Sequence, residues 1–101
     1  MIKHNEIEKG QRLYFYSEET KKIESGLVFD TTPGYDFFTV YLLGYGGILA
    51  DNLFLTEKDC IVYMNDTFTI GEKKCKEKLN WNRQHLKNIK KIAKEKGITL
   101  E

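Results

Sequence analysis

An apolar and aromatic stretch, Tyr35–Leu55, dominates the pattern of the chain and predicts two strands joined by a turn. Along its first nine residues both alternating faces are mainly apolar or aromatic, which is typical of a strand covered on both sides. Gly44, Gly46 and Gly47 then allow the positive φ that a tight reversal needs. From Ile48 onwards the apolar pattern resumes as a second strand. We therefore expect this hairpin to form the centre of the core.

Shorter segments before and after this hairpin also have β-forming patterns. Gln11–Ser17 is short and rich in aromatic residues, and Ile23–Asp30 follows it after a charged turn. Gly26, inside the second of these segments, indicates a bulge or a tight bend of the kind that small barrels have at their corners. Cys60–Met64 and Thr67–Ile70 complete the set. Five or six short strands at this spacing predict a small antiparallel barrel or a strongly bent sheet.

Two connections between these segments carry turn signals of their own. Pro33 presets φ and Gly34 accepts a positive φ, so residues 32–35 predict a type II turn. Thr56 and Asp59 have the spacing of a single capped turn. Both connections are expected to join strands.

The period of the apolar residues changes to that of a helix between Glu72 and Lys96. One stripe at helical spacing consists of Cys75, Leu79, Leu86, Ile89 and Ala93. Thr69 and Glu72 have the spacing of a capping box, and Gly97 is placed to end the helix. A continuous helix would be about 37 Å long at about 1.5 Å per residue, which is more than the small barrel can cover. We therefore expect either a break near Asn80–Asn82 or a partner for the far end of the helix.

These patterns predict a single α+β domain. Residues 1–9 form an N-terminal arm, residues 10–70 the antiparallel barrel and residues 72–96 a basic amphipathic helical segment. The apolar content of 41%, with 13% aromatic residues, excludes a disordered chain. No run approaches the ~18 apolar residues of a membrane span, and the N-terminus lacks the apolar core of a signal peptide. We therefore expect a cytoplasmic protein without a membrane partner, in which Cys60 and Cys75 are reduced.

The net charge is only +1, but the charges are segregated along the chain. Residues 1–71 carry six basic and eleven acidic side chains, a net charge of −5, and residues 72–101 carry ten and four, a net charge of +6. A basic ridge lies beside the apolar stripe and consists of Lys76, Arg83, Lys87, Lys90 and Lys94, widened by Lys73 and Lys91. The ridge is either a solvated face or an anion-binding surface for nucleic acid or an acidic protein. Because it contains a single arginine, base-specific bidentate contacts are not expected.

Motifs for catalysis or cofactor binding are weak. Gly44–Gly47 lacks the following helix and the lysine of a phosphate-binding loop. His4 and His85 have no cysteine or histidine at metal-ligand spacing, and Ser17 and Ser25 lie outside any nucleophile motif. The sequence does not exclude a pair of carboxylates for acid–base catalysis, because two carboxylates that are distant in sequence can lie close together in space. We therefore predict no enzyme activity, no cofactor and no metal site.

Two aromatic residues are candidate partner contacts. Trp81 either covers the end of the barrel or anchors a partner, since tryptophan is frequent at interaction hot spots. Tyr45, in the glycine turn, belongs to a set of six tyrosines, and those that face outwards would form a rigid amphipathic surface. The predicted partner-binding residues are Lys76, Trp81, Arg83, Lys87, Lys90, Lys94 and Tyr45.

Two stretches of the chain resemble small SH3-like-barrel proteins of phages and mobile elements of Gram-positive bacteria. Gly10–Val28 is similar to the first hairpin of these proteins, and Thr67–Leu79 is similar to their final strand and the charged helix start that follows it. Gly71 departs from that pattern. The resemblance implies an SH3-like barrel followed by a helix, in a phage or mobile-element setting. It assigns no functional residue.

We predict a non-catalytic binding module: a phage or mobile-element accessory protein that binds a host protein in the host cytoplasm, with inhibition of host defence as one role. The alternative is a non-specific nucleic-acid-binding protein that uses the basic helix. We also predict a homodimer, because a straight helix would expose apolar residues beyond the barrel, and burying each one is worth about 1.5–3 kcal/mol. The predicted self-association residues are Leu86, Ile89, Ile92 and Ala93.

Overall fold

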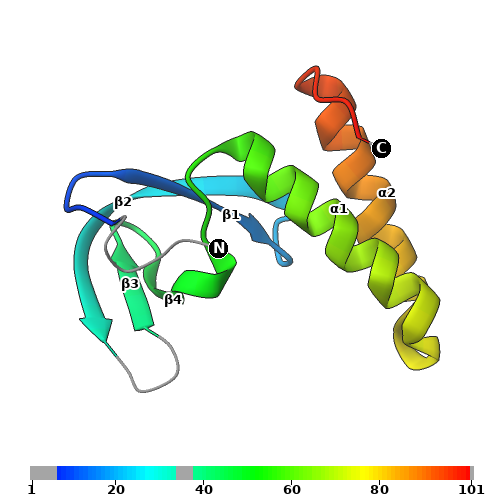
Figure 1. Cartoon of the computed structure of the whole chain (residues 1–101), viewed down its shortest axis with the longest axis horizontal. Coiled ribbons are helices and arrows are strands. Elements are labelled where there is room, and N and C mark those ends of the chain that lie inside the picture. The colour runs from blue at the N-terminus through cyan, green and yellow to red at the C-terminus, as the bar shows by residue number, and fades with distance from the viewer. Residues whose placement is uncertain (1–6, 34–37, 101) are drawn as a thin grey trace.

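The computed structural model describes residues 7–33 and 38–100, in which an antiparallel sheet is followed by two helices (Figure 1). The strands are β1 (Arg12–Ser17), β2 (Lys22–Pro33), β3 (Phe38–Leu42) and β4 (Gly46–Leu49). The helices are α1 (Glu57–Lys74) and α2 (Leu79–Glu95), preceded by the short 3-10 segments η2 (Ala50–Asn52) and η3 (Lys76–Lys78) respectively. The predicted α+β class is confirmed.

The long strand β2 joins the two halves of the sheet. Its first half pairs antiparallel with β1 and its second half with β3, which in turn pairs with β4. The register shifts between Val28 and Asp30, and this bulge bends the sheet. The predicted bend at Gly26 lies two residues earlier, where a Cβ atom would be 3.0 Å from the Cβ of Leu42 and 3.1 Å from the ring of Tyr45. Gly26 therefore lets β3 and the turn after it pack closely against β2.

The strand order β1-β2-β3-β4 is that of an antiparallel meander. Between the described strands there is no pairing of β4 with β1, and an isolated bridge between Tyr14 and Phe54 ties β1 to the segment after β4. Barrel closure is therefore not shown. The described residues contain four strands in place of the predicted five or six, and the predicted boundary of the β region at residue 70 is wrong, because helix α1 begins at Glu57.

The predicted central hairpin is present as β3 and β4, but its second strand, expected to continue to Leu55, ends at Leu49 and is followed by η2. Gly44 and Gly46 have φ values of 87° and 77°, as the reversal between the strands requires. The predicted covering of both faces is only partial, since Val40 and Leu42 on one face of β3 are buried, whereas Tyr41 on the other face is half-buried. The predicted type II turn at residues 32–35 lies partly outside the described residues.

Residues 57–74 form one helix, so the strands predicted at Cys60–Met64 and Thr67–Ile70 are wrong. The segment is rich in β-forming residues, but its buried positions follow a helical period: Cys60, Ile61, Asn65 and Phe68. The capped turn at Thr56 is confirmed, because the Thr56 side chain accepts a hydrogen bond from the Asp59 N–H at 3.0 Å. That turn begins an 18-residue helix. The capping box predicted at Thr69 is wrong, since this residue lies inside α1 and its hydroxyl donates to the Asn65 carbonyl.

The helical segment predicted over residues 72–96 is divided between two helices, so the alternative of one continuous helix is wrong. Helix α1 ends at Lys74, and α2 begins at Leu79 after a short linker. The predicted break exists, but it precedes Asn80–Asn82, which lie inside α2. The predicted end at Gly97 is confirmed: its φ is 70°, and the Ile98 N–H donates to the Ala93 carbonyl in a Schellman arrangement.

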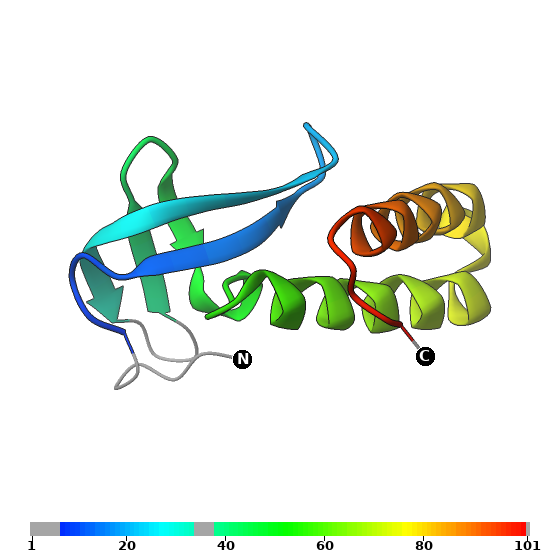
Figure 2. The same ribbon diagram turned by 90° about the horizontal axis from the view of Figure 1, so that it is seen from above.

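The two helices form an antiparallel pair beside the sheet (Figure 2). Ion pairs link Glu57 with Lys96 and Glu72 with Arg83, so the start of α1 lies beside the end of α2. A helix core lies between the helices and the end of β1 and consists of Tyr16, Phe54, Cys60, Ile61, Phe68, Leu86, Ile89 and Ala93. A separate sheet core consists of Leu13, Val28, Val40, Leu42, Ala50 and Leu53.

The N-terminal arm predicted over residues 1–9 is described only from Ile7 onwards. Ile7 packs against the sheet core, and residues 7–9 form neither helix nor strand. Within the described ranges, neither helix has the length and apolar character required to cross a membrane.

Candidate protein-interaction face

The residues predicted to mediate self-association are used inside the protomer. Leu86, Ile89 and Ala93 are buried members of the helix core, and Ile92 packs against that core. The expectation that they would be exposed assumed a straight helix that outruns a barrel, and this premise is wrong. Self-association through them would require the helix pair to open.

The predicted basic ridge is only partly assembled. Arg83, Lys87, Lys90 and Lys94 lie on the exposed side of α2, whereas Lys76 belongs to the linker. Arg83 approaches Glu72 of α1, with 3.6 Å between Nε and Oε1. No ion pair involves the three α2 lysines within the described part of the chain.

Trp81 and Tyr45 both pack against neighbours in the protomer. The Trp81 ring lies 4.5 Å from the His85 ring and 5.6 Å from the Phe68 ring, between centroids. Trp81 therefore covers the end of the helix core and not the end of a barrel. The Tyr45 hydroxyl donates to Glu24 at 2.9 Å, and this hydrogen bond is the main reason why the pKa of Tyr45 is raised. Both residues keep part of their surface exposed.

A polar cluster centred on the buried residues Tyr16 and His85 links α2 to the β1–β2 hairpin. The Tyr16 hydroxyl lies 2.6 Å from Nδ1 of His85, and the Asn88 amide donates both to that hydroxyl and to the Lys21 carbonyl. The Tyr16 hydroxyl therefore accepts one hydrogen bond from Asn88 and shares a second one with Nδ1 of His85. Burial lowers the pKa of His85 and raises that of Tyr16. The cluster therefore serves as a neutral, structural link.

The described residues contain no cluster of three or more side chains that could bind a metal ion. Of the two free cysteines, Cys60 is fully buried, and burial raises the pKa of its thiol to about 12, with a smaller contribution from the charge of Glu57. At neutral pH this thiol is therefore protonated and a poor nucleophile. Cys75 is half-buried in the linker.

The side of α1 that faces away from α2 carries exposed apolar residues. Val62, Tyr63 and Ile70 are 37%, 42% and 54% exposed, and Leu55, just before the helix, is 42% exposed. Asp59 and Asp66 lie among them at helical spacing. We call this set the outer face of α1: Leu55, Asp59, Val62, Tyr63, Asp66 and Ile70.

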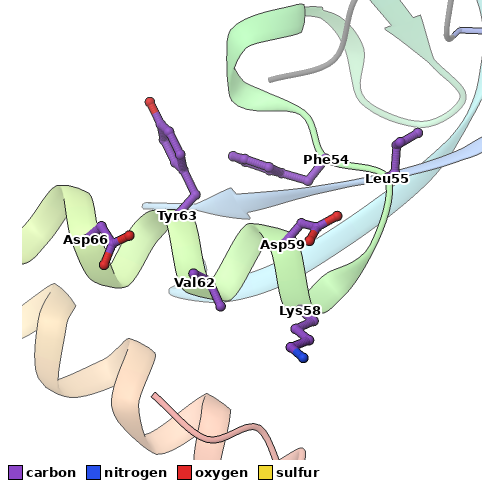
Figure 3. Close-up of a pocket in the computed structure, with 7 residues that line it drawn as sticks. All are labelled: Phe54, Leu55, Lys58, Asp59, Val62, Tyr63 and Asp66. Atoms are coloured by element: carbon purple, nitrogen blue, oxygen red, sulfur yellow. The ribbon is translucent and has the colours of Figure 1, made fainter. Parts of the chain in front are cut away.

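A groove with a volume of about 480 Å³ runs along the first half of this face (Figure 3). It is lined by Phe54, Leu55, Lys58, Asp59, Val62, Tyr63 and Asp66. The rings of Phe54 and Tyr63 are 5.1 Å apart between centroids and stand on the same side of the helix, while Lys58 points away from them. The volume falls in the range of about 300–1,000 Å³ that is usual for ligand pockets.

A second depression, of about 540 Å³, adjoins the groove at Phe54 and Tyr63. It extends to the β1–β2 turn and brings in Glu18 and Glu19. The described linings of the two depressions thus contain four carboxylates and one ammonium group, that of Lys58. The site is apolar at its centre and acidic at its edges.

This face was missed in the sequence because Cys60–Met64 was interpreted as a strand. A helical wheel over residues 57–74 places Asp59, Val62, Tyr63 and Asp66 on one side. The available signals were the Thr56 cap, the acidic first turn and the lysines of the last turn.

Comparisons with protein-family models, curated proteins and solved structures found no match to this chain.

Proposed function

We propose that the protein is a non-catalytic binding module that holds a partner protein on the outer face of α1. The observation that carries this proposal is the row of exposed apolar side chains along this face, three of which line the groove. Single exposed apolar residues are common on protein surfaces and need no explanation. Nine large apolar side chains of the described residues are exposed, and four of them, Leu55, Val62, Tyr63 and Ile70, lie along this one face. A concentration of this kind is typical of an interaction surface.

The structure behind the face supports the proposal. The opposite side of α1 is fixed in the helix core by Cys60, Ile61 and Phe68, which are almost fully buried. A helix held in this way presents its outer side chains in a defined arrangement before a partner binds. Preorganisation of this kind reduces the entropic cost of association.

The test is a selection of helical peptides from a displayed random library on the immobilised wild-type protein. Val62→Asp places a charge in the groove, and Leu43→Asp places the same charge at an exposed position of the β3–β4 turn. We expect selected peptides to lose about tenfold or more in affinity for Val62→Asp, which is about 1.4 kcal/mol, and to bind Leu43→Asp normally. Circular dichroism checks that both variants are folded. Peptides that bind Val62→Asp as well as the wild type would refute the proposal.

The hypothesis that the partner is a host protein, bound by a phage or mobile-element accessory protein, rests on the resemblance alone. Gly10–Val28 covers β1 and all of the half of β2 that pairs with it, in keeping with a first hairpin. Thr67–Leu79 does not contain the expected strand, since it covers the end of α1, the linker and the first residue of α2. The resemblance therefore supports this hypothesis through one of its two stretches.

Non-specific nucleic-acid binding is the second candidate function. The observation that favours it is the group of exposed lysines on α2, Lys87, Lys90, Lys91 and Lys94, which have no ion pair within the described residues. Titration of labelled single- and double-stranded DNA at low salt tests this candidate, with Lys87→Ala/Lys90→Ala/Lys94→Ala as the variant. Binding that weakens with added salt and is lost in the variant would support it, because phosphate contacts release counterions. Absence of binding at low salt would remove it.

A further inference from the structure

The charges around the groove have a regular arrangement. Asp59 and Asp66 are seven residues apart on α1, which corresponds to about 10 Å along the helix axis at about 1.5 Å per residue. Val62 and Tyr63 lie midway between them, so the face presents a carboxylate, an apolar pair and a second carboxylate in order. No salt bridge involves either aspartate within the described residues.

The second depression, which adjoins the groove, is also acidic. Glu18 and Glu19 of the β1–β2 turn lie beyond Phe54 and Tyr63, so carboxylates flank the apolar centre on more than one side. Opposite charges across an interface speed the encounter and exclude wrong partners, whereas like charges repel. An acidic partner, including a nucleic acid, is therefore disfavoured at this face.

A second copy of this chain fits the groove poorly. Its α2 carries Lys87 and Lys94 at the same spacing of seven residues, but Lys90 and Lys91 stand between them. An α2 helix laid on the groove would therefore bring ammonium groups onto Val62 and Tyr63. Removing an ammonium group from water against apolar side chains is unfavourable unless the group is paired.

We propose that the outer face of α1 recognises a cationic amphipathic helix of another protein. This helix carries one or two large apolar side chains that enter the groove, and a lysine or arginine about one turn before and one turn after them. Its cations pair with Asp59 and Asp66, and its apolar side chains contact Phe54, Val62 and Tyr63. The inference rests on the proposed function, since it names the chemistry of the partner at the same site.

Three synthetic helical peptides test the inference by fluorescence anisotropy. All three have two adjacent leucines at the centre, and the flanking positions, seven residues apart, are both lysine, both glutamine or both glutamate. The protein variants are Asp59→Asn/Asp66→Asn and, as a matched control, Glu77→Gln/Glu95→Gln, which removes two exposed carboxylates outside the groove. Val62→Asp tests the groove itself.

We expect the lysine peptide to bind the wild type about tenfold or more tighter than the glutamate peptide, with the difference shrinking as salt is added. The double aspartate variant should lose most of this preference, and the control variant should keep it. If all three peptides bind alike and Val62→Asp abolishes their binding, the charge inference fails and the proposed function stands. If none of the peptides binds, or Val62→Asp changes nothing, the proposed function fails as well.

Discussion

The two halves of the molecule have cores of different chemistry. The sheet core consists entirely of aliphatic side chains, such as Leu13, Val40 and Leu42. The helix core instead mixes aromatic rings with aliphatic side chains, and the helices that form it also carry the buried polar residues Asn65, Asn82 and His85. The sheet is held by neighbours in sequence, whereas the helices are tied to the sheet by contacts such as Tyr16 with His85, which are 69 residues apart. The position of the outer face therefore depends on long-range, geometrically specific contacts.

The largest expected effect on stability comes from removing the Phe68 ring from the helix core. Phe68 is 1% exposed, and its ring contacts those of Tyr16, Trp81 and His85. We expect Phe68→Ala to lower the free energy of unfolding by about 3–5 kcal/mol, measured by urea denaturation. The control is Phe29→Ala on the exposed side of the sheet, with an expected cost of about 1 kcal/mol or less. Equal costs for the two variants would mean that the helix pair does not depend on this ring.

A smaller effect tests how closely the helices approach. A Cβ atom on Gly71 of α1 would lie 2.3 Å from Oδ1 of Asn82, which is buried and whose amide donates to the Lys78 carbonyl. Helix propensity alone predicts that Gly71→Ala stabilises the protein by about 1 kcal/mol. We expect Gly71→Ala to lower the free energy of unfolding by about 1–3 kcal/mol instead, because Asn82 must move.

The double variant Gly71→Ala/Asn82→Ala completes a cycle that isolates the clash. In the Asn82→Ala background, Gly71→Ala should lower the free energy of unfolding much less than in the wild type, since the obstructing amide is gone. Stabilisation by Gly71→Ala in the wild-type background would show that the helices are further apart than described.

These cases show why one half of the fold was predictable and the other was not. The β3–β4 hairpin follows from local signals, namely the apolar run and the glycines with positive φ at positions 44 and 46. Cys60–Met64 is equally β-forming in composition, but Thr56 caps a helix there, and burial against α2 decides the outcome. The strand interpretation also hid the groove, because Asp59, Val62 and Asp66 share a face only on a helix.

The polar cluster predicts a dependence of stability on pH. Burial lowers the pKa of His85 from 6.5 in the folded state, so the unfolded chain binds a proton more readily. Stability from this residue is therefore present above pH 6.5 and is lost as the pH falls below it. Among the charges near His85, Glu18 opposes the shift and Lys21 reinforces it.

The measurement is the free energy of unfolding between pH 7.5 and pH 5 for the wild type and for His85→Gln. We expect a shallower fall in the variant than in the wild type, because the variant lacks the group whose pKa differs between the folded and unfolded states. The same slope in His85→Gln and the wild type would show that His85 titrates normally.

The smallest perturbation is chemical labelling of the two thiols, which reports how tightly α1 is closed over the helix core. Iodoacetamide at neutral pH should modify Cys75 in the linker and leave Cys60 intact, because Cys60 is inaccessible and burial raises its pKa to about 12. The masses of proteolytic peptides after brief labelling give the extent of modification of each cysteine. Labelling of the unfolded protein in urea is the control, in which both cysteines should react. Rapid native modification of Cys60 would mean that α1 opens readily.

The most direct test of the central claim is a map of backbone amide chemical shifts while the lysine-flanked helical peptide is added to the isotopically labelled protein. The outer face of α1 should respond, with the largest changes at Asp59, Val62, Tyr63 and Asp66. The exposed lysines of α2, Lys87, Lys90 and Lys94, should not change. Changes confined to α2, or saturable binding that leaves α1 unperturbed, would contradict the assignment of this face as the binding site.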